Sequence, residues 1–423
     1  MKRTLLTGNA AAAWGARLAN VDYIPSFPIT PQTEIIESLS EWIDNGEMPG
    51  RLVTLESEHS MITAAGSAAA TGIRTFSATS SQGLLYGMEM LYTVSGWRAP
   101  FVLVNVSRGL SSPITLEPDH NDIFAARDCG FLKIHCASCQ EILDSILIAY
   151  RLGEDARVRL PVIVNMDGFY LSFTREPVVI PDEESAREFV GNFDPENIHF
   201  SASAPESQAV AVLGGGPYSY FRYETHLAAM NGLAAYEEIA EEFGQRFGRS
   251  HSAVESYCAD DADYLFVMLG SFATKAKEAV DRLRVCGWSI GLVRPRLVRP
   301  FPASQLQHLL ADRKGIAVID QNISMGMGGV LHSELATALY GQSGKQPILA
   351  SFIGALGGRD IAIEEFFEIA EVIKQAASSG VTPPPRLLYT REELREIRKL
   401  QAVARAERDE LNNNSGHKKG EAQ

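Results

Sequence analysis

The sequence predicts an α/β protein built on doubly wound parallel sheets. Over the first 170 residues, short apolar runs alternate with amphipathic or alanine-rich stretches. Strands that alternate with helices in this way predict a parallel sheet with helices on both faces. The apolar runs are continuous, as strands covered on both faces require. A second alternating pattern begins at Asp263, which predicts a smaller parallel α/β domain after the first.

The elements of the first domain follow from this alternation. Its expected strands are residues 5–7, 23–25, 51–55, 75–79, 101–106, 131–135 and 162–165. Its expected helices are residues 10–18, 33–42, 60–70, 84–94, 122–127 and 142–152. From about residue 175 to 255 prolines break the pattern, so we expect an extension with a turn at Gly214–Pro217 and a helix over 224–247. The first domain is therefore expected to span residues 1–255.

The second domain is expected to span residues 256–380. Its strands are predicted at 264–269, 289–293, 315–320 and 348–353, and its helices at 273–285, 303–311 and 329–339. After three consecutive prolines comes a tail, residues 381–423. Residues 391–410 have a charged helical pattern, and the polar composition of 412–423 predicts no fixed structure.

Composition excludes several classes of protein. With 423 residues, 45% hydrophobic and 21% charged, the chain is neither largely disordered nor a simple coiled coil. Its net charge of -14 argues against nucleic-acid binding. No apolar run is long enough for a membrane span or a signal peptide, so we expect a cytoplasmic protein that does not bind membranes. Five cysteines are too few for several iron–sulfur clusters, which take about four thiolates each.

Two motifs follow the second and third predicted strands. In Phe27-Pro28-Ile29-Thr30-Pro31 the prolines hold the backbone extended and direct the Thr30 hydroxyl, but a helix cap by Thr30 is the simpler interpretation. In Leu55-Glu56-Ser57-Glu58-His59-Ser60 the acids either complement a helix dipole or place one carboxylate beside a cofactor nitrogen. The residues alone do not decide between these two roles for the acids.

Two more motifs end the next pair of strands. Thr79-Ser80-Ser81-Gln82-Gly83-Leu84 opens a helix, where its polar groups either bind an anion or cap the helix. Arg108 ends the strand that begins at Phe101, at the sheet edge where open parallel sheets bind ligands. Its guanidinium suits a carboxylate ligand, and an exposed salt bridge is an equal alternative.

Three further patterns favour structural interpretations. Glu117-Pro118-Asp119-His120-Asn121-Asp122 lacks a complete set of metal ligands, so we expect a loop that caps the helix from Asp122. Cys136 and Cys139 form a lone CxxC, and buried structural thiols are favoured over a redox pair. Gly214-Gly215-Gly216 lacks the lysine of a phosphate-binding loop.

In order and spacing, these segments resemble the alpha subunit of the 2-oxoacid:acceptor oxidoreductases, the pyruvate:ferredoxin oxidoreductase family. The resemblance covers roughly residues 4 to 365 and also includes Thr7-Gly8-Asn9-Ala10, Ala126-Arg127-Asp128-Cys129-Gly130-Phe131, Arg294–Pro302 and Gly357-Gly358-Arg359-Asp360. It implies a thiamine-diphosphate-binding domain of the pyrimidine type, followed by a domain like the transketolase C-terminal domain. It also implies oxidative decarboxylation of a 2-oxo acid with coenzyme A, giving acyl-CoA, carbon dioxide and two electrons.

The resemblance also implies roles for single residues. Glu58 matches the glutamate that hydrogen-bonds the aminopyrimidine, Arg108 the arginine that binds the substrate carboxylate, and Thr30 a threonine that hydrogen-bonds the substrate. Further cofactor contacts are expected from Pro28, Ile29, Ser81, Gln82 and Gly83. This chain is expected to bind no metal itself.

The remaining parts of the enzyme are expected on partner chains. The resemblance implies a beta subunit that holds the pyrophosphate and Mg²⁺, a gamma subunit and a ferredoxin-like delta subunit with 4Fe-4S clusters; an NAD/flavin subunit stays open. Residues 112–118 differ from the sequence that is usual in the pyruvate enzymes. Pyruvate and an aryl 2-oxo acid such as phenylglyoxylate are therefore both expected candidates for the substrate. Two other functions remain open: a transketolase or 2-oxoacid dehydrogenase-like subunit that acylates lipoamide, and a non-catalytic scaffold.

Overall fold

The computed structural model describes residues 2–194, 200–342, 344 and 346–420, with side chains described as far as residue 410. The chain divides into two compact units, residues 1–385 and 386–423. The predicted division of the larger unit at residue 255 stays a prediction.

The first large sheet has the strand order β12-β6-β7-β5-β4. Four of its strands are parallel: β4 (Phe76–Thr79), β5 (Val102–Ser107), β6 (Leu132–His135) and β7 (Val162–Asp167). All four were expected from their apolar runs. The edge strand β12 (Leu297–Arg299) is antiparallel to β6 and directly follows β11 (Ile290–Pro295), a strand of the second sheet. Backbone pairing between β12 and β6 thus connects the part of the larger unit around the second sheet to the first sheet.

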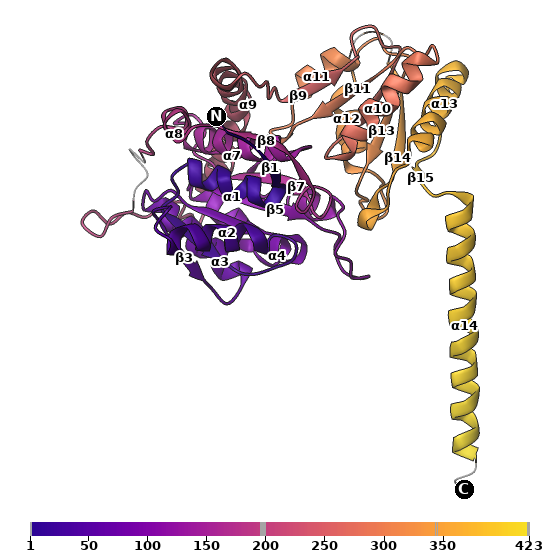
Figure 1. The fold of residues 1–423 in the computed structure, drawn as a ribbon, viewed down its shortest axis with the longest axis horizontal. Helices are drawn as coiled ribbons and strands as arrows, with labels where there is room; N and C mark the ends of the chain where they lie inside the picture. The colour runs from indigo at the N-terminus through magenta and orange to yellow at the C-terminus, as the bar shows by residue number, and fades with distance from the viewer. Residues whose placement is uncertain (1, 195–199, 343, 345, 421–423) are drawn as a thin grey trace. The chain divides into compact units, whose positions relative to one another are not determined.

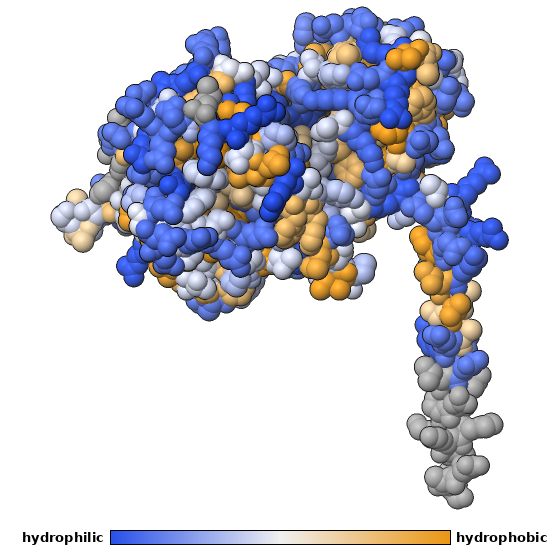
Figure 2. Space-filling model, viewed as in Figure 1, coloured by the Kyte–Doolittle hydropathy of each residue, from blue (hydrophilic) through white to orange (hydrophobic). Residues whose placement is uncertain are grey.

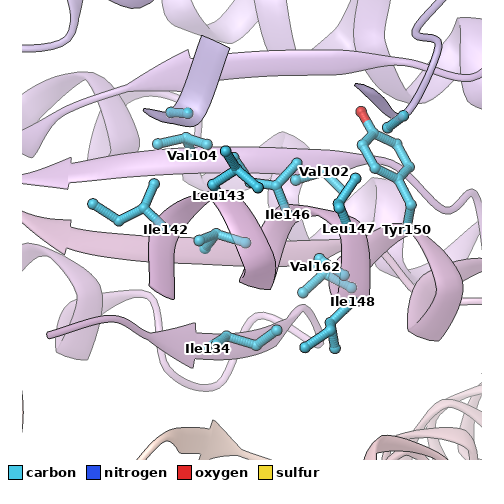
Figure 3. Packing of buried hydrophobic residues seen from close by; sticks show 14 of the residues in the cluster. Val102, Val104, Ile134, Ile142, Leu143, Ile146, Leu147, Ile148, Tyr150 and Val162 are labelled. Atoms are coloured by element: carbon cyan, nitrogen blue, oxygen red, sulfur yellow. The ribbon is translucent and has the colours of Figure 1, made fainter. Parts of the chain in front are cut away.

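The core of this part lies between the sheet and α7 (Cys139–Glu154). Figure 3 shows Ile142, Leu143, Ile146, Leu147 and Tyr150 of this helix beside Val102, Val104 and Val162 of the strands. These side chains are 0 or 1% exposed, and each contributes roughly 1.5–3 kcal/mol on burial. This packing holds the strand ends, and with them the loops that follow, in fixed positions.

Two smaller ribbons flank the first sheet. In one, β2 (Tyr23–Ser26) pairs in parallel with β3 (Arg51–Thr54), and a parallel bridge from Tyr23 to Thr75, directly before β4, connects this ribbon to the edge of the first sheet. In the other, β1 (Lys2–Thr7) pairs antiparallel with β8 (Arg175–Ile180). The expected strand at 5–7 therefore exists but does not belong to the parallel sheet. An apolar run of three residues carries no information about the direction of its partner.

The second large sheet includes, in order, β14 (Ile348–Ile353), β13 (Gly315–Asp320), β10 (Tyr264–Met268), β11 (Ile290–Pro295) and β9 (Val254–Tyr257). Of these five strands, all except β9 are parallel, and β9 is antiparallel to β11. The helices around it are α10 (Phe272–Val285), α11 (Ala303–Leu310), α12 (Val330–Leu339) and α13 (Ile363–Ser379), drawn in orange to yellow in Figure 1. The short helix η1 (Leu356–Gly358) follows β14. The sequence predicted this second α/β pattern.

Several helices differ from expectation at their ends. The remaining helices of the larger unit are α1 (Gly8–Leu18), α2 (Thr33–Asp44), α3 (Glu58–Ala70), α4 (Ser81–Tyr86), α5 (Met88–Gly96), α6 (Asn121–Ala125), α8 (Glu183–Val190) and α9 (Gly215–Phe247). The predicted helix 84–94 is interrupted at Gly87. The turn predicted at Gly214–Pro217 is wrong, because α9 already begins at Gly215. Proline is tolerated in the first helical turn, where its missing N–H has no helical partner.

The C-terminal unit contains β15 (Arg386–Leu387) and α14 (Arg391–Gly420). This helix extends beyond the predicted 391–410, into the segment expected to lack fixed structure. Figure 2 shows apolar side chains along its described part, where Leu394, Ile397, Leu400 and Val403 are exposed. Among the described helices, none has an apolar stretch long enough to cross a membrane.

Candidate active site

Four of the motifs singled out in the sequence follow the carboxyl ends of β2, β3, β4 and β5. Thr30 comes after β2, Glu58 after β3, Gln82 after β4 and Arg108 after β5. In open parallel sheets this edge is where ligands bind. Hydrogen bonds from Arg108 bring Thr30 and Gln82 together, and Gly83 lies against Glu58. Of the other predicted residues, Pro28 is exposed and Ile29 is half-buried.

Glu58 is the first residue of α3, and its side chain is buried. Ser57 caps the helix by accepting a hydrogen bond from the Ser60 N–H at 3.2 Å. Glu56, in contrast, is exposed and accepts a hydrogen bond from the Ser60 hydroxyl. Within the described residues, no hydrogen bond or ion pair engages the Glu58 carboxylate. Of the two acids in the motif, Glu58 is therefore the one whose side chain is buried without a partner among the described residues.

Gly83 leaves the space in which the Glu58 carboxylate lies. A Cβ atom at residue 83 would be 2.5 Å from Glu58 Oε1 and 2.6 Å from Thr79 Oγ1. Both distances are too short for nonbonded atoms. Gly83, which the resemblance predicts as a cofactor contact, thus also makes room for the Glu58 side chain.

Arg108 is buried, and two of its nitrogens are engaged by the protein. Its Nη1 donates to the Thr30 carbonyl at 2.8 Å, and its Nη2 donates to Gln82 Oε1 at 2.8 Å. Burial lowers the pKa of Arg108, and the nearby Asp122 and Glu58 only partly oppose this shift; a guanidinium remains a cation under such a shift. The alternative of an exposed salt bridge is wrong for the described chain, since Arg108 is 8% exposed and pairs with no carboxylate.

Thr30 does not cap the following helix. Helix α2 begins at Thr33 with Gln32 as its N-cap residue, and Thr30 instead offers its backbone carbonyl to Arg108. Its side chain is exposed at the edge of the sheet. The prediction from composition that Thr30 caps the helix is therefore wrong.

Asp122 is a buried acceptor that joins the two central loops of the site. Its Oδ2 accepts from the backbone N–H of Ser81 at 3.1 Å and of Arg108 at 3.2 Å. Its Oδ1 accepts from the Ser107 hydroxyl at 2.6 Å. Burial raises the pKa of Asp122, and hydrogen bonds from Ser107 and Asn105 oppose this shift. Sequence reasoning expected only a helix cap here, because these donors are separated from Asp122 along the chain.

Ser81 has a backbone conformation that its neighbours maintain. Its φ of 50° lies in the left-handed region, which non-glycine residues rarely adopt. Asp122 accepts its N–H, and the Gly109 carbonyl accepts its hydroxyl at 3.0 Å. Because that N–H is already bonded, it does not serve the anion site considered for this motif.

The Asp119–His120 loop contacts the second half of the larger unit. The His120 N–H donates to the Gln321 carbonyl at 2.8 Å, and its Nε2 lies 2.7 Å from Asp167 Oδ1. The Ser271 hydroxyl donates to Asp167 Oδ2 at 2.6 Å. Ligating atoms of His120, His135 and Asp167 lie within 4.8 Å of one another, but hydrogen bonds connect them. The loop thus links the Arg108 region to α10 and β13.

The CxxC thiols are buried and free. Burial raises the pKa of Cys136 to about 12 and that of Cys139 further. The thiolate is the reactive form of cysteine, so these shifts disfavour redox chemistry at both residues. The structural interpretation from the sequence agrees with this environment.

Comparisons with known proteins extend over most of the chain. Residues 14–243 match the family described as "Pyruvate flavodoxin/ferredoxin oxidoreductase, thiamine diP-bdg", and residues 262–366 match "Pyruvate:ferredoxin oxidoreductase core domain II". Similar curated proteins include pyruvate synthase subunit PorA of Pyrococcus abyssi, 38% identical over 90% of this chain and 96% of that protein. PorA of Methanocaldococcus jannaschii is 41% identical over 88% and 95%, and ketoisovalerate oxidoreductase subunit VorA of Pyrococcus horikoshii is 38% identical over 89% and 95%.

A solved structure has the same fold. It is the 2-oxoglutarate:ferredoxin oxidoreductase from Magnetococcus marinus with 2-oxoglutarate, coenzyme A and succinyl-CoA bound, with a TM-score of 0.67 and 18% identity. The similarity covers 89% of this chain and 65% of that one, slightly less than two thirds of its length. Together with the sequence matches, these findings establish that the chain is an oxidoreductase component, the alpha subunit, of the 2-oxoacid:ferredoxin oxidoreductase family.

Proposed function

We propose that this chain holds the aminopyrimidine half of a thiamine diphosphate site and the carboxylate of a 2-oxo acid. The observation that carries the proposal is the buried, unbonded Glu58 carboxylate at the same sheet edge as the Arg108 guanidinium. The family implies thiamine diphosphate, coenzyme A and iron–sulfur partners in a multisubunit enzyme. Placing the pyrimidine half on this chain is our inference.

The residues present fit such a group. Thr79 Oγ1, Ser80 Oγ and Arg108 Nε are buried without a hydrogen-bond partner among the described residues, and the Glu58 carboxylate lies against Gly83 close to Thr79 Oγ1. Buried polar atoms normally have partners. A polar ring at this edge would supply them.

Each residue then has a chemical task. Glu58 would hold a proton at a ring nitrogen of the aminopyrimidine, and Arg108 would bind the substrate carboxylate through two N–H groups. Thr30 lies beside Arg108, where its exposed hydroxyl can reach the substrate. Thiamine diphosphate, when bound, supplies the carbanion chemistry of decarboxylation.

We assign the remaining functions to partner chains. Of the five cysteines here, three are buried and two are exposed, and they do not form a set of four ligands. We therefore place the clusters on partner chains, among them a ferredoxin-like delta subunit and a gamma subunit. We also assign the Mg²⁺ and pyrophosphate contacts to a beta subunit, as the family resemblance implies. These partner assignments and a cytoplasmic location remain proposals. An NAD/flavin subunit stays a prediction.

For the substrate we propose a small aliphatic 2-oxo acid. The curated relatives reported above are named for pyruvate and ketoisovalerate. Phenylglyoxylate, expected from the unusual residues 112–118, stays a prediction. A lipoamide-linked function is disfavoured by membership in the ferredoxin-linked family.

The test is Glu58→Gln in the reconstituted complex. The amide cannot hold the proton as the carboxylate does, so turnover should fall about 10²-fold or more. Circular dichroism and assembly with partners should be unchanged. Glu56→Gln is the matched control, because that carboxylate is exposed and bonded to Ser60. Unchanged turnover in Glu58→Gln would remove Glu58 from the site, and full activity of Glu58→Gln and Arg108→Ala together would favour a scaffold.

A further inference from the structure

We infer that Gln82 is a positioning residue that orients the Arg108 guanidinium toward the substrate carboxylate. The inference rests on the proposed function and adds a residue whose side chain acts through Arg108. It also connects Arg108 to the loop after Gly109, where substrate preference is expected to reside.

The hydrogen bonds of Gln82 determine the orientation of its amide. Its Oε1 accepts from Arg108 Nη2 at 2.8 Å, and it shares the single Ser81 hydroxyl hydrogen with the Gly109 carbonyl, at 2.7 and 3.0 Å. Its Nε2 donates to the Ser111 hydroxyl at 2.7 Å. Exchanging the amide oxygen and nitrogen would put an N–H₂ group against the Arg108 donor and lose a bond. The carbonyl oxygen therefore faces Arg108.

Among the described residues, two hydrogen bonds orient the end of the Arg108 side chain. Nη1 donates to the Thr30 carbonyl and Nη2 to Gln82, whereas Nε is buried with no partner among the described residues. Each terminal nitrogen carries two hydrogens, so one on each remains for a ligand. Two parallel N–H groups match the two oxygens of a carboxylate. Loss of either contact would free the plane of the guanidinium to rotate.

Gln82 is uncharged, and this matters for substrate binding as much as its position does. A carboxylate at this place would orient the guanidinium equally well but would pair with it and compete with the substrate. The acidic groups that face Arg108 are Glu58 from α3 and Asp122 from α6, and neither forms an ion pair with it in the described chain. Gln82 thus orients the cation and leaves its charge available.

Ser111 extends this arrangement to the next loop. It is exposed and lies three residues after Arg108, yet its hydroxyl accepts from Gln82 rather than from Arg108. A change in the loop at Ser111 therefore reaches the guanidinium through a single side chain. This path gives a physical reason for loop residues to affect binding of the substrate.

The decisive experiment measures three quantities in the reconstituted complex of Gln82→Glu: KM for pyruvate, kcat, and the thiamine diphosphate concentration for half-maximal activity. We expect KM to rise about tenfold or more, since the new carboxylate occupies the cation. The kcat should stay within about threefold, and KM should change more than cofactor half-saturation does; both would change equally if Gln82 served only as the cofactor contact expected from the sequence. Inhibition by oxamate, a non-reacting 2-oxo acid analogue, should weaken in parallel with KM. Gln245→Glu, on the exposed face of α9, is the control for added charge.

A second variant keeps the inference testable if Gln82→Glu does not fold. Ser111→Ala removes the acceptor of the Gln82 amide, and KM should rise about two- to fivefold with cofactor half-saturation unchanged. Unchanged KM in both variants, or equal losses in kcat and cofactor affinity, would overturn the inference. Arg108→Ala measured in parallel separates the two proposals. If it leaves kcat/KM intact, the carboxylate clamp itself fails; if it abolishes substrate use while both other variants are silent, only the role of Gln82 fails.

Discussion

The Glu58 carboxylate lies directly against Gly83, so that a Cβ atom on residue 83 would be 2.5 Å from Glu58 Oε1. The two residues come from different strand–helix units, α3 and α4. The position of the glutamate therefore depends on the absence of a side chain on the neighbouring loop. This dependence can be tested without changing Glu58 itself.

Gly83→Ala should displace the Glu58 carboxylate. Overpacking of this kind costs about 1–3 kcal/mol, and a displaced catalytic group loses further activity. We expect kcat to fall about tenfold or more, with a modest decrease in Tm. Gly96→Ala is the control, because a Cβ there meets nothing within 4 Å. Equal activity of both variants would show that Glu58 tolerates displacement.

Arg108→Lys should weaken substrate use more than cofactor binding. Lysine keeps the charge but loses the planar fork and cannot reach both Thr30 and Gln82 in the same geometry. Arg108→Ala should lower kcat/KM further, by about 1.5–3 kcal/mol of transition-state binding. The loss should appear with every 2-oxo acid, because all share the carboxylate. A change only in the preference between substrates would contradict the clamp.

The isolated chain should be inactive and should bind thiamine diphosphate weakly. It supplies the proposed pyrimidine half only, so the diphosphate and Mg²⁺ contacts must come from another subunit. Isothermal titration of the purified chain, followed by addition of the partner subunits, measures this. Turnover by the chain alone would refute the divided site.

Acid stability should depend on a buried ion-pair cluster around Glu141. Its Oε1 accepts hydrogen bonds from Arg294 and, at 2.8 Å, from Arg296. Burial by itself would raise the pKa of Glu141, but the two arginines outweigh it and hold the pKa well below the ordinary 4.5. A depressed carboxyl pKa means that the unfolded chain binds the proton first. The stabilisation is therefore complete above about pH 4.5 and is lost as the pH falls toward the folded value.

Glu141→Gln should remove this contribution. Breaking a buried pair costs about 3–5 kcal/mol, so the free energy of unfolding at pH 7 should fall by that order. Its decline from pH 5 to pH 3 should also become shallower than in the unchanged chain. Urea unfolding at several pH values measures both effects. Glu188→Gln removes an exposed pair with Arg246 and should change neither.

The sequence by itself determined the elements and the edge at which the site lies. Continuous apolar runs are a local property, so β5 and β7 could be predicted from their own residues. Arg108 and Glu58 could be placed in the same way, one at a strand end and the other at a helix start. Choosing Glu58 over Glu56 as the candidate site residue required either the family resemblance or the structure, in which Glu58 is buried and Glu56 is exposed.

Only the tertiary structure decided the contacts between these elements. The antiparallel pairing of β1, the return of β12 to the first sheet, and the bonds from Asp122 to the loops of Ser81 and Arg108 all join distant segments. The same is true of Gln82, whose partner lies 26 residues away. Periodicity reports which face of an element is buried, but not which neighbour covers it. The geometry around Arg108 depends on those neighbours, because hydrogen-bond partners are chosen by distance in space rather than along the chain.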